Sequence, residues 1–294
     1  MDQNKRIFAL GFFDGVHLGH QALLAECVRL AKEMDAQTAA ITFEHHPQSL
    51  FRADVPPLLT TLADRVRLLN RYGIEQVIAY PVTGEVMGMH WEDFLRGLLD
   101  RGAVGFVCGD DFRFGSRGAG NSRTLKAFCE ARGLPCVIVP EQTLNGVRIS
   151  SSYIRRQIDS GDMATAVRFL GHGHMLTGTV VTGRKLGHKL GFPTANIELP
   201  EGVIVPRHGV YACYAYVGAD RYMAVCNVGS RPTVLGHQVR METWLLEFSG
   251  DLYGQQVTLE FLRFLRPEQR FESVEILRQA VLQDAENTRK FFEK

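Results

Sequence analysis

The sequence predicts two domains in succession: an α/β domain with a parallel, Rossmann-like sheet, then a small antiparallel β-barrel with a C-terminal helix. Three observations carry this prediction. The chain has 294 residues, enough for two domains of ordinary size. Short apolar runs alternate with helical patterns in its first half. Its second half holds β-rich runs without helices between them.

Apolar runs in the first half predict strands, and segments with helical periodicity predict helices. The predicted strands are residues 6–10, 39–43, 76–80, 105–108 and 135–139. The predicted helices are residues 21–34, 61–72, 91–101 and 122–132. This alternation indicates a parallel sheet with helices on both faces, and ligands of such sheets bind beyond the carboxyl ends of the strands.

A change of rhythm predicts the boundary between the domains. Residues 159–170 are expected to form a short helix that the glycines of Gly171-His-Gly-His174 end. We therefore expect the first domain over residues 1–158, a connecting helix and linker over 159–172, and the second domain over 173–294.

The second domain is expected to be a barrel closed by a helix. Its predicted strands are residues 176–182, 209–217, 222–228, 240–248 and 257–265. A final helix over residues 273–292 is expected to pack on the barrel. The apolar stripe for this packing is Val274, Leu277, Val281 and Ala285.

Composition excludes several classes of protein. Hydrophobic residues make up 45% of the chain and charged residues 22%, which are globular values. The formal net charge of +1 gives no electrostatic case for binding nucleic acid or a membrane surface. No apolar run approaches the roughly 20 residues of a membrane span, and the start of the chain lacks a signal core. Six scattered cysteines indicate a reducing cytoplasm and no zinc site, and we expect a monomer or a weak homo-oligomer.

The most informative stretch is Gly-Phe-Phe-Asp-Gly-Val-His-Leu-Gly-His, from Gly11 to His20. It lies between a predicted strand and a predicted helix, so it presents a helix N-terminus, which favours an anion. His17 and His20 face the same way on a first helical turn, where imidazole or imidazolium N–H groups can hold phosphate oxygens. The alternative is a capped loop with two histidines in solvent. The candidate residues are Gly11, Phe12, Phe13, Asp14, Gly15, His17, Gly19 and His20.

Further polar stretches are expected at the same edge of the sheet. Residues 42–47 follow the second predicted strand, and a Gly- and Arg-rich loop follows the fourth. That loop suits a nucleotide or a second ligand, with a flexible solvent loop as the alternative. Its candidate residues are Asp110, Phe112, Arg113 and Gly115.

A serine-rich stretch is predicted to begin the next helix. Ser151 or Ser152 is expected as its N-cap, with Arg155 and Arg156 one turn in. Such an N-terminus can bind a triphosphate, and the alternative is a cap and nothing more.

A second dense stretch, residues 183–196, is rich in glycine and basic residues and predicts a cationic flap. Thr194 and Asn196 lie two residues apart on an extended segment and offer hard oxygen ligands that suit Mg²⁺. The alternative is a Gly-rich hairpin with a turn at Pro193. The candidate residues for ATP are Gly183, Lys185, Gly191, Pro193, Thr194 and Asn196.

Glu242 is a candidate general base. If Met241 and Leu245 face the interior of the barrel, Glu242 points the other way with Trp244. A carboxylate there, near bound Mg-ATP, can accept the proton of an attacking hydroxyl. A glutamate on a strand is otherwise a solvated surface residue.

Motifs across nearly the whole chain resemble the bacterial bifunctional riboflavin kinase/FAD synthetases. The His-x-Gly-His turn resembles their adenylyltransferase half. Later motifs resemble their riboflavin kinase module, in order. They are Gly191-Phe-Pro-Thr-Ala-Asn196, Gly209-Val-Tyr211, Asn227-Val-Gly-Ser-Arg-Pro-Thr233, Glu242-Thr-Trp-Leu-Leu-Glu-Phe248, Asp251-Leu-Tyr-Gly254 and Arg266-Pro-Glu268.

This resemblance implies two reactions. The second module would transfer the γ-phosphate of ATP to riboflavin, giving FMN, with Mg²⁺ on Thr194 and Asn196 and with Glu242 as the base. The first would transfer AMP from ATP to FMN, giving FAD and pyrophosphate. His17, His20 and the Arg155 region would stabilise the charge there, Ser151 and Ser152 would bind ATP, and the loop at residues 110–115 would line the flavin or nucleotide site.

The chain departs from the usual family pattern at four positions. His45, Ser152, His188 and Trp244 stand where proline, threonine, arginine and histidine are common. His188 weakens the fixed positive charge of the flap at neutral pH. Two alternatives to a bifunctional enzyme stay open: a protein in which only one module works, and a flavin or nucleotide sensor without turnover.

Overall fold

The computed structural model describes residues 5–183, 191–233 and 236–293. The chain folds into two compact units, residues 1–58 with 62–150 and residues 59–61 with 151–294. The second unit therefore includes the segment that was expected to connect the domains. The functional bounds at residues 158 and 173 stay a prediction.

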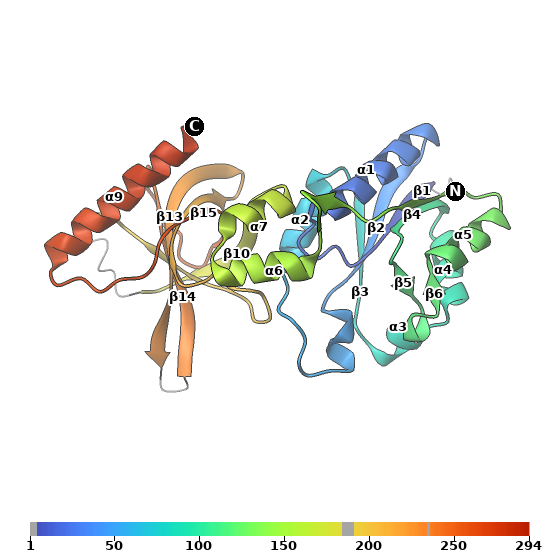
Figure 1. Ribbon diagram of the computed structural model, residues 1–294, viewed down its shortest axis with the longest axis horizontal. Helices are drawn as coiled ribbons and strands as arrows, with labels where there is room; N and C mark the ends of the chain where they lie inside the picture. The colour runs from blue at the N-terminus through green and yellow to red at the C-terminus, as the bar shows by residue number, and fades with distance from the viewer. Residues whose placement is uncertain (1–4, 184–190, 234–235, 294) are drawn as a thin grey trace. The chain divides into compact units, whose positions relative to one another are not determined.

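The first unit contains the predicted parallel sheet. Its strand order is β3-β2-β1-β4-β7, and every pairing is parallel (Figure 1). The strands are β1 Arg6–Leu10, β2 Gln37–Phe43, β3 Gln76–Tyr80, β4 Ala103–Gly109 and β7 Cys136–Val139. The order reverses at β1, so β2 and β4 flank it, and such a switch point is where open α/β sheets bind ligands.

Helices cover this sheet. They are α1 Leu18–Glu33, α2 Leu62–Arg71, α3 Gly84–Gly88, α4 Trp91–Asp100 and α5 Ser122–Glu130. Leu98 of α4 and Phe128 of α5 pack with Phe8 and Phe106 on one face. Alternate strand residues such as Ile7 point to the other face, where α1 packs along β1, β2 and β4.

Several short elements were not predicted because they hold too few residues to show a period. They are η1 Pro47–Leu50, α3, η2 Ser116–Gly118 and the two-residue strands β5 Arg113–Phe114, β6 Gly120–Asn121, β8 Thr143–Leu144 and β9 Val147–Arg148. The β5–β6 pair replaces the flexible loop that was the alternative after the fourth strand, and its Phe114 is buried.

The helix predicted over residues 159–170 ends at the predicted residue but begins later than predicted. The structure has α6 over Ser151–Ser160 and α7 over Met163–Leu170, with Asp162 as the N-cap of α7. Gly161 between them has a φ of 85°, which favours glycine and ends α6.

The second unit contains the predicted antiparallel barrel, which is closed in the order β10-β11-β14-β13-β12-β15. Its strands are β10 His174–Val181, β11 Ala195–Glu198, β12 Gly209–Val217, β13 Asp220–Thr233, β14 Gly236–Leu245 and β15 Gln256–Arg266. Strand β11 was not predicted, because four residues after a glycine-rich stretch carry no readable alternation. It closes the barrel between β10 and β14.

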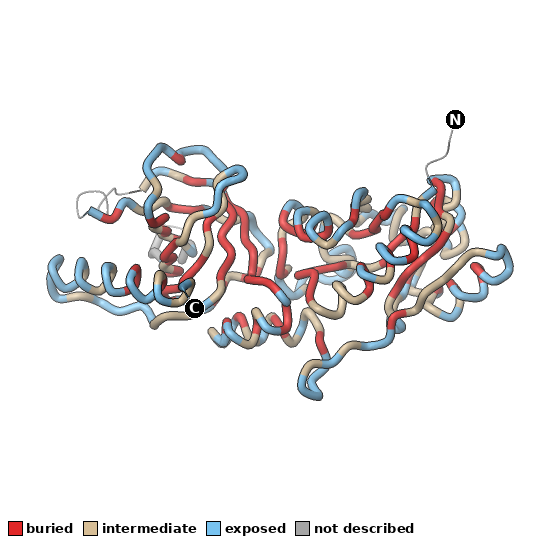
Figure 2. The backbone as a smooth tube through the Cα atoms, turned by 90° about the horizontal axis from the view of Figure 1, so that it is seen from above, coloured by how far each residue is buried: buried red, intermediate tan, exposed pale blue. Residues whose placement is uncertain are grey.

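The C-terminal helix α9, Val274–Phe292, packs on β12 and β13, as predicted (Figure 1). Figure 2 shows buried barrel strands beside a helix that is exposed along most of its length. In the predicted apolar stripe Ala285 is buried and Leu277 and Val281 are half-buried, whereas Val274, the first residue of the helix, is 47% exposed. No helix in the described ranges is long and apolar enough to cross a membrane.

Candidate functional site

The turn after β1 is held in an unusual backbone conformation. Gly15 has a φ of 82°, and the non-glycine residues Phe13 and Val16 have φ values of 57° and 39°. The N–H of Val16 donates to the carbonyl of Phe13 at 3.1 Å, which closes the turn. Positive φ is costly for residues with a side chain and is concentrated at functional sites.

Two glycines of the turn make room for its own aromatic rings. A Cβ at Gly11 would lie 2.9 Å from the Phe13 ring, and one at Gly19 would lie 3.3 Å from the imidazole of His17. In the structure these glycines allow Phe13 and His17 to pack against the chain, which fixes the rings in place.

His17 and His20 form the centre of this site. Helix α1 begins at Leu18, three residues earlier than predicted, because His17 caps it: the N–H of His20 donates to His17 Nδ1 at 3.3 Å. The two rings are stacked with centroids 3.6 Å apart and planes 12° apart. The expected common orientation of the two histidines is therefore observed, and the alternative of two solvent histidines fails because His17 is only 6% exposed.

The surroundings of His20 disfavour a charged imidazole. Burial lowers the pKa of His20 well below its usual value, and the neighbouring His17 and Arg65 lower it further. Imidazole and imidazolium were both considered as phosphate donors, and this environment favours the neutral imidazole. A neutral imidazole still donates one N–H, so it can serve in the predicted role.

The loop after β4 lies at the same edge of the sheet as the turn after β1, because the strands are parallel neighbours. The Phe112 and Phe114 rings stack with centroids 5.4 Å apart, and Gly115, at a φ of 71°, passes close to the backbone of Trp91. Asp110 and Arg113 are exposed. The predicted loop residues thus divide into an aromatic support and exposed polar groups.

Helix α6 begins at Ser151, so Ser151 and Ser152 belong to its first turn. The prediction of either serine as the N-cap was wrong, because the backbone is already helical there and Ser150 precedes the helix. Arg155 is half-buried. This helix belongs to the second compact unit, and its predicted partnership with the histidine turn stays a prediction.

Strand register aligns one row of residues across the barrel. Asn196 of β11 pairs with Glu242 of β14, which pairs with Asn227 of β13. The row continues through Val210 of β12 to Arg266 of β15. Directly paired residues in antiparallel strands point to the same face, so these side chains share one face of the sheet.

That face is the outer face of the barrel. Met241 and Thr243, the neighbours of Glu242, are 0% exposed and point into the barrel, whereas Glu242 and Trp244 are half-buried. The predicted alternation along this strand is therefore correct. Thr194 immediately precedes β11 and lines the same pocket as Glu242.

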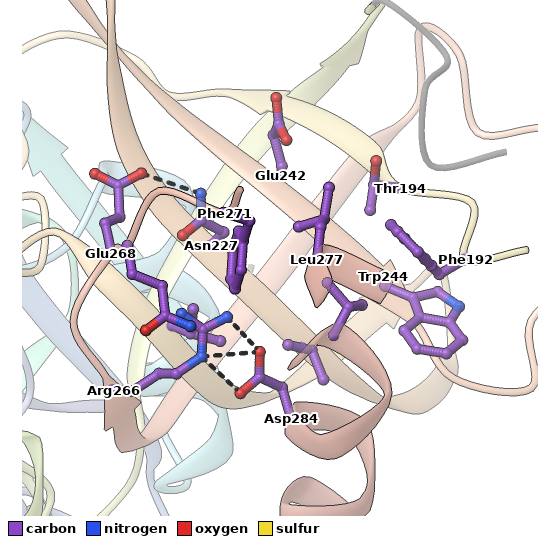
Figure 3. A pocket seen from close by; sticks show the side chains of 14 residues that line it. Phe192, Thr194, Asn227, Glu242, Trp244, Arg266, Glu268, Phe271, Leu277 and Asp284 are labelled. Atoms are coloured by element: carbon purple, nitrogen blue, oxygen red, sulfur yellow. Dashed lines mark hydrogen bonds and ion pairs between the residues drawn. The ribbon is translucent and has the colours of Figure 1, made fainter. Parts of the chain in front are cut away.

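A pocket of about 260 Å³ opens on this face between the barrel and α9. Figure 3 shows Glu242 and Thr194 at one end and an ion pair between Arg266 and Asp284 at the other. Apolar side chains occupy much of the wall between these ends. They are Phe192, Val210, Val225, Trp244, Phe271, Leu277 and Val281.

Polar contacts fix the wall away from Thr194. Arg266 Nε and Nη2 donate to both carboxylate oxygens of Asp284, at 3.0, 3.2 and 2.7 Å, and Asp284 is 3% exposed. Asn227 Nδ2 donates to Glu268 Oε1 at 3.3 Å. Sequence reasoning did not assign these four residues to a site, although Asn227, Arg266 and Glu268 belong to two of the quoted motifs. Their common place depends on strand register, which no local pattern reveals.

The start of the predicted flap contacts the predicted metal ligand. Gly183 lies so close to the side-chain amide of Asn196 that a Cβ at residue 183 would overlap it. Gly191 and Pro193 are exposed. Lys185 and His188, which were assigned to the flap, lie outside the described residues. No group of three or more His, Cys, Asp or Glu side chains in the described ranges forms a metal cluster.

Two protein-family models match the chain in succession. The FAD synthetase model matches residues 1–153, which contain the histidine turn, and the riboflavin kinase model matches residues 170–292, which contain the barrel pocket. The chain belongs to the bifunctional riboflavin kinase/FMN adenylyltransferase family.

Members of this family match over the full length. The bifunctional riboflavin kinase/FMN adenylyltransferase of Listeria monocytogenes is 34% identical, covering 100% of this chain and 94% of its own. That of Bacillus subtilis is 32% identical, with 99% and 94% covered. A crystal structure named as a macrolide-efflux protein from Streptococcus pneumoniae is similar with a TM-score of 0.85 and 29% identity, covering 97% of this chain and 94% of that one. This last likeness supports the fold of the family over both units.

Proposed function

We propose that this chain makes FMN from riboflavin and ATP in its barrel module, and FAD and pyrophosphate from FMN and ATP in its first module. Membership of the bifunctional family supports both activities. The observation that carries the kinase proposal furthest is the row Asn196–Glu242–Asn227, in which the carboxylate of Glu242 neighbours the proposed metal ligand Asn196 and lines a largely apolar pocket.

In the kinase reaction Glu242 is the proposed general base. The apolar wall of the pocket suits the flavin ring, which leaves the ribityl chain directed toward Glu242. The carboxylate takes the proton of the terminal ribityl hydroxyl as its oxygen bonds to the γ-phosphorus of ATP. The bond from that phosphorus to the bridging oxygen breaks, and ADP leaves.

Thr194 and Asn196 fit a magnesium ion. They offer a hydroxyl and an amide oxygen on the face that carries Glu242, and hard oxygen donors are the ligands Mg²⁺ prefers. Glycine at 183 leaves room for the Asn196 amide itself, which a Cβ at that residue would overlap. Bound there, Mg²⁺ would neutralise charge on the phosphates, while Gly183 and Gly191 begin and end the proposed phosphate cover.

In the adenylyltransferase reaction the FMN phosphate attacks the α-phosphorus of ATP, and pyrophosphate leaves. No covalent enzyme intermediate is required. His17 and His20 are the proposed donors to the charge that spreads over the α-phosphate. Ser151, Ser152 and Arg155 are proposed to hold the triphosphate, and the loop from Asp110 to Gly115 is proposed to line the flavin or nucleotide site.

One product assay tests the function and its alternatives. The purified chain is incubated with riboflavin, ATP and Mg²⁺, and the flavins are separated by chromatography with fluorescence detection. FMN followed by FAD is the expected result. FMN alone would indicate a kinase-only protein, FAD formed only from supplied FMN would indicate an adenylyltransferase, and unchanged riboflavin in every mixture would leave the sensor hypothesis.

The cytoplasm is the proposed location. All six cysteines are free thiols, as is usual in a reducing compartment. The proposed partners are the small molecules riboflavin, FMN and ATP, and a monomer or weak homo-oligomer remains our expectation for the assembly.

A further inference from the structure

Helix α2 carries a charged side chain that is completely buried. Arg65 is 0% exposed and ranks first in volume among the fully buried side chains described. Burying a guanidinium costs free energy unless hydrogen bonds and an opposite charge offset that cost. None of the proposed catalytic steps uses Arg65, so its place in the fold requires another explanation.

The guanidinium connects α2 to the carboxyl end of β2 and from there to the histidine turn. Arg65 Nη1 donates to the carbonyl of Phe43 at 2.7 Å and to Thr42 Oγ1 at 3.0 Å. Thr42 Oγ1 donates in turn to the carbonyl of Phe12 at 2.6 Å. A continuous chain of hydrogen bonds therefore connects Arg65 of α2 to the backbone carbonyl of Phe12.

Arg65 also contacts the turn directly, on both sides of Phe13. Its Cζ lies 4.5 Å from the centre of the Phe12 ring, and its Nη2 lies 4.0 Å from Asp14 Oδ1, a carboxylate that is 1% exposed. Phe13 itself has a φ of 57°. A non-glycine residue persists in that conformation only where its surroundings hold it, and Arg65 supplies a contact to each flanking residue.

Ring packing makes the positions of the two histidines depend on the position of Phe13. The Phe13 ring lies edge-on to His20, with centroids 5.3 Å apart, and His20 stacks on His17. Since these rings are packed in contact, a shift of residues 12–14 moves the atoms that donate to phosphate. The charge of Arg65 also acts on His20, after burial and His17, in lowering its pKa.

We propose that Arg65 is a positioning residue of the adenylyltransferase site: it holds residues 12–14 over the carboxyl ends of β1 and β2 and so fixes where His17 and His20 present their N–H groups. This inference rests on the proposed adenylyl transfer. Arg65 has no contact with substrate in this role. A purely structural role predicts lower stability and an unchanged mechanism in the folded fraction, so kinetics separate the two.

The test uses the full chain with Arg65→Met and Arg65→Lys, and both activities are measured in each preparation. Riboflavin phosphorylation reports that the other module is folded. We expect Arg65→Met to lower kcat for FMN adenylylation by about 10- to 100-fold, because small misplacements of catalytic groups cost that much. Phosphorylation should stay within about twofold. Arg67→Met, at an exposed position of the same helix, is the matched control and should leave both activities unchanged.

The pH profile distinguishes positioning from stability. Removing the cation beside His20 allows that imidazole to protonate at higher pH, so the acid limb of adenylylation kcat should move to higher pH in Arg65→Met. Arg65→Lys keeps the charge and should leave the limb in place while still lowering kcat, because an ammonium lacks the planar fork of donors. A loss of stability alone would leave the acid limb in place in both variants.

Thr42→Val keeps the test decisive if the Arg65 variants do not fold. It removes the hydroxyl that links Arg65 to Phe12 and keeps a similar shape, and it should lower adenylylation kcat several-fold with phosphorylation unchanged. Full adenylylation in Thr42→Val, equal loss of both activities in Arg65→Met, or an unmoved acid limb in that variant overturns the inference. Absence of FAD formation by the unsubstituted chain overturns the proposed function, and this inference with it.

Discussion

The hydrogen bond from the backbone N–H of His20 to His17 Nδ1 determines which ring atom His17 can offer to a ligand. That bond requires a lone pair on Nδ1, so a neutral His17 carries its proton on Nε2. Capping α1 and donating to phosphate are therefore tasks of the two different nitrogens of one imidazole. Full protonation of His17 would cost the helix its cap.

The lowered pKa of His20 gives a prediction for stability against pH. Below its usual pKa of 6.5 an unfolded His20 takes up a proton, whereas the folded one, disfavoured by burial and then by His17 and Arg65, does not. Above pH 6.5 neither state binds this proton, so stability does not depend on it. As the pH falls from there toward the folded pKa, the unfolded state binds the proton and the folded state does not, which destabilises the fold. The thermal midpoint should therefore fall more in the wild type than in His20→Gln between about pH 7.5 and about pH 5.5. Equal falls would contradict the pKa shift.

Glu242→Gln should stop FMN formation, because an amide cannot accept the proton of the attacking hydroxyl. A loss of about 100-fold or more in kcat is expected for a general base, with FMN supplied directly still converted to FAD. The measurement is chromatography of products from riboflavin and from FMN in parallel. Glu201→Gln, an exposed glutamate of the same module, is the control. Normal kinase turnover in Glu242→Gln would remove Glu242 from its role.

At the scale of elements, α9 determines the shape of the proposed kinase pocket. Its residues Leu277, Val281 and Asp284 form one wall, and the barrel row from Asn227 to Arg266 forms the facing wall. The bidentate bond between Arg266 and Asp284 joins the two walls at the end away from Glu242. The pocket therefore exists only while the helix stays docked.

Asp284→Ala should loosen this helix and weaken riboflavin binding. It leaves Arg266, which is 23% exposed, without its carboxylate partner, and breaking a buried pair costs on the order of 3 kcal/mol. We expect KM for riboflavin to rise more than KM for ATP in steady-state kinetics. The matched control is Glu286→Ala, which removes an exposed ion pair with Lys290 on the same helix and should change stability by less than about 1 kcal/mol. An unchanged KM for riboflavin would mean that the docking of α9 does not affect riboflavin binding.

At the scale of the whole molecule, the proposed kinase pocket and the histidine turn lie on residues of different compact units, whereas the residues proposed to hold the triphosphate of the adenylyl reaction, Ser151, Ser152 and Arg155, belong to the second unit. Every residue that lines the kinase pocket belongs to the second unit, and the histidine turn belongs to the first. The pocket lies against the barrel, and the histidine turn follows a strand of the parallel sheet. A substitution in one module should therefore leave the chemistry of the other intact.

Mixing two inactive variants tests this independence. His17→Ala should abolish FAD formation and keep FMN formation, whereas Glu242→Gln should do the reverse. A mixture of both chains should then convert riboflavin to FAD, because FMN released by one chain can enter the other. Chromatography of the mixture and of each variant alone gives the answer. No FAD in the mixture would mean that FMN is not exchanged between chains or that one substitution damages both modules.

The sequence by itself determined the order and type of most elements and the place of the two motif-rich stretches. Strand and helix periods are local, so runs such as residues 6–10 and 76–80 were assigned with their observed bounds. The glycine-rich turn from Gly11 and the alternation of faces around Glu242 were also predicted from local patterns. Local patterns failed where an element was very short, as in β11, and where one helix ends and the next begins around Gly161, so that the start of α7 was placed too early.

Only the tertiary structure decided which distant residues meet. Arg65 and Asp14 come together through the packing of α2 on the sheet, and Asn227, Arg266 and Asp284 come together through strand register and helix docking. Hydrogen-bond register and the burial of charge depend on long-range packing, which leaves no period in the chain. The type of each element follows from neighbouring residues, whereas the composition of each site follows from the closure of the whole fold.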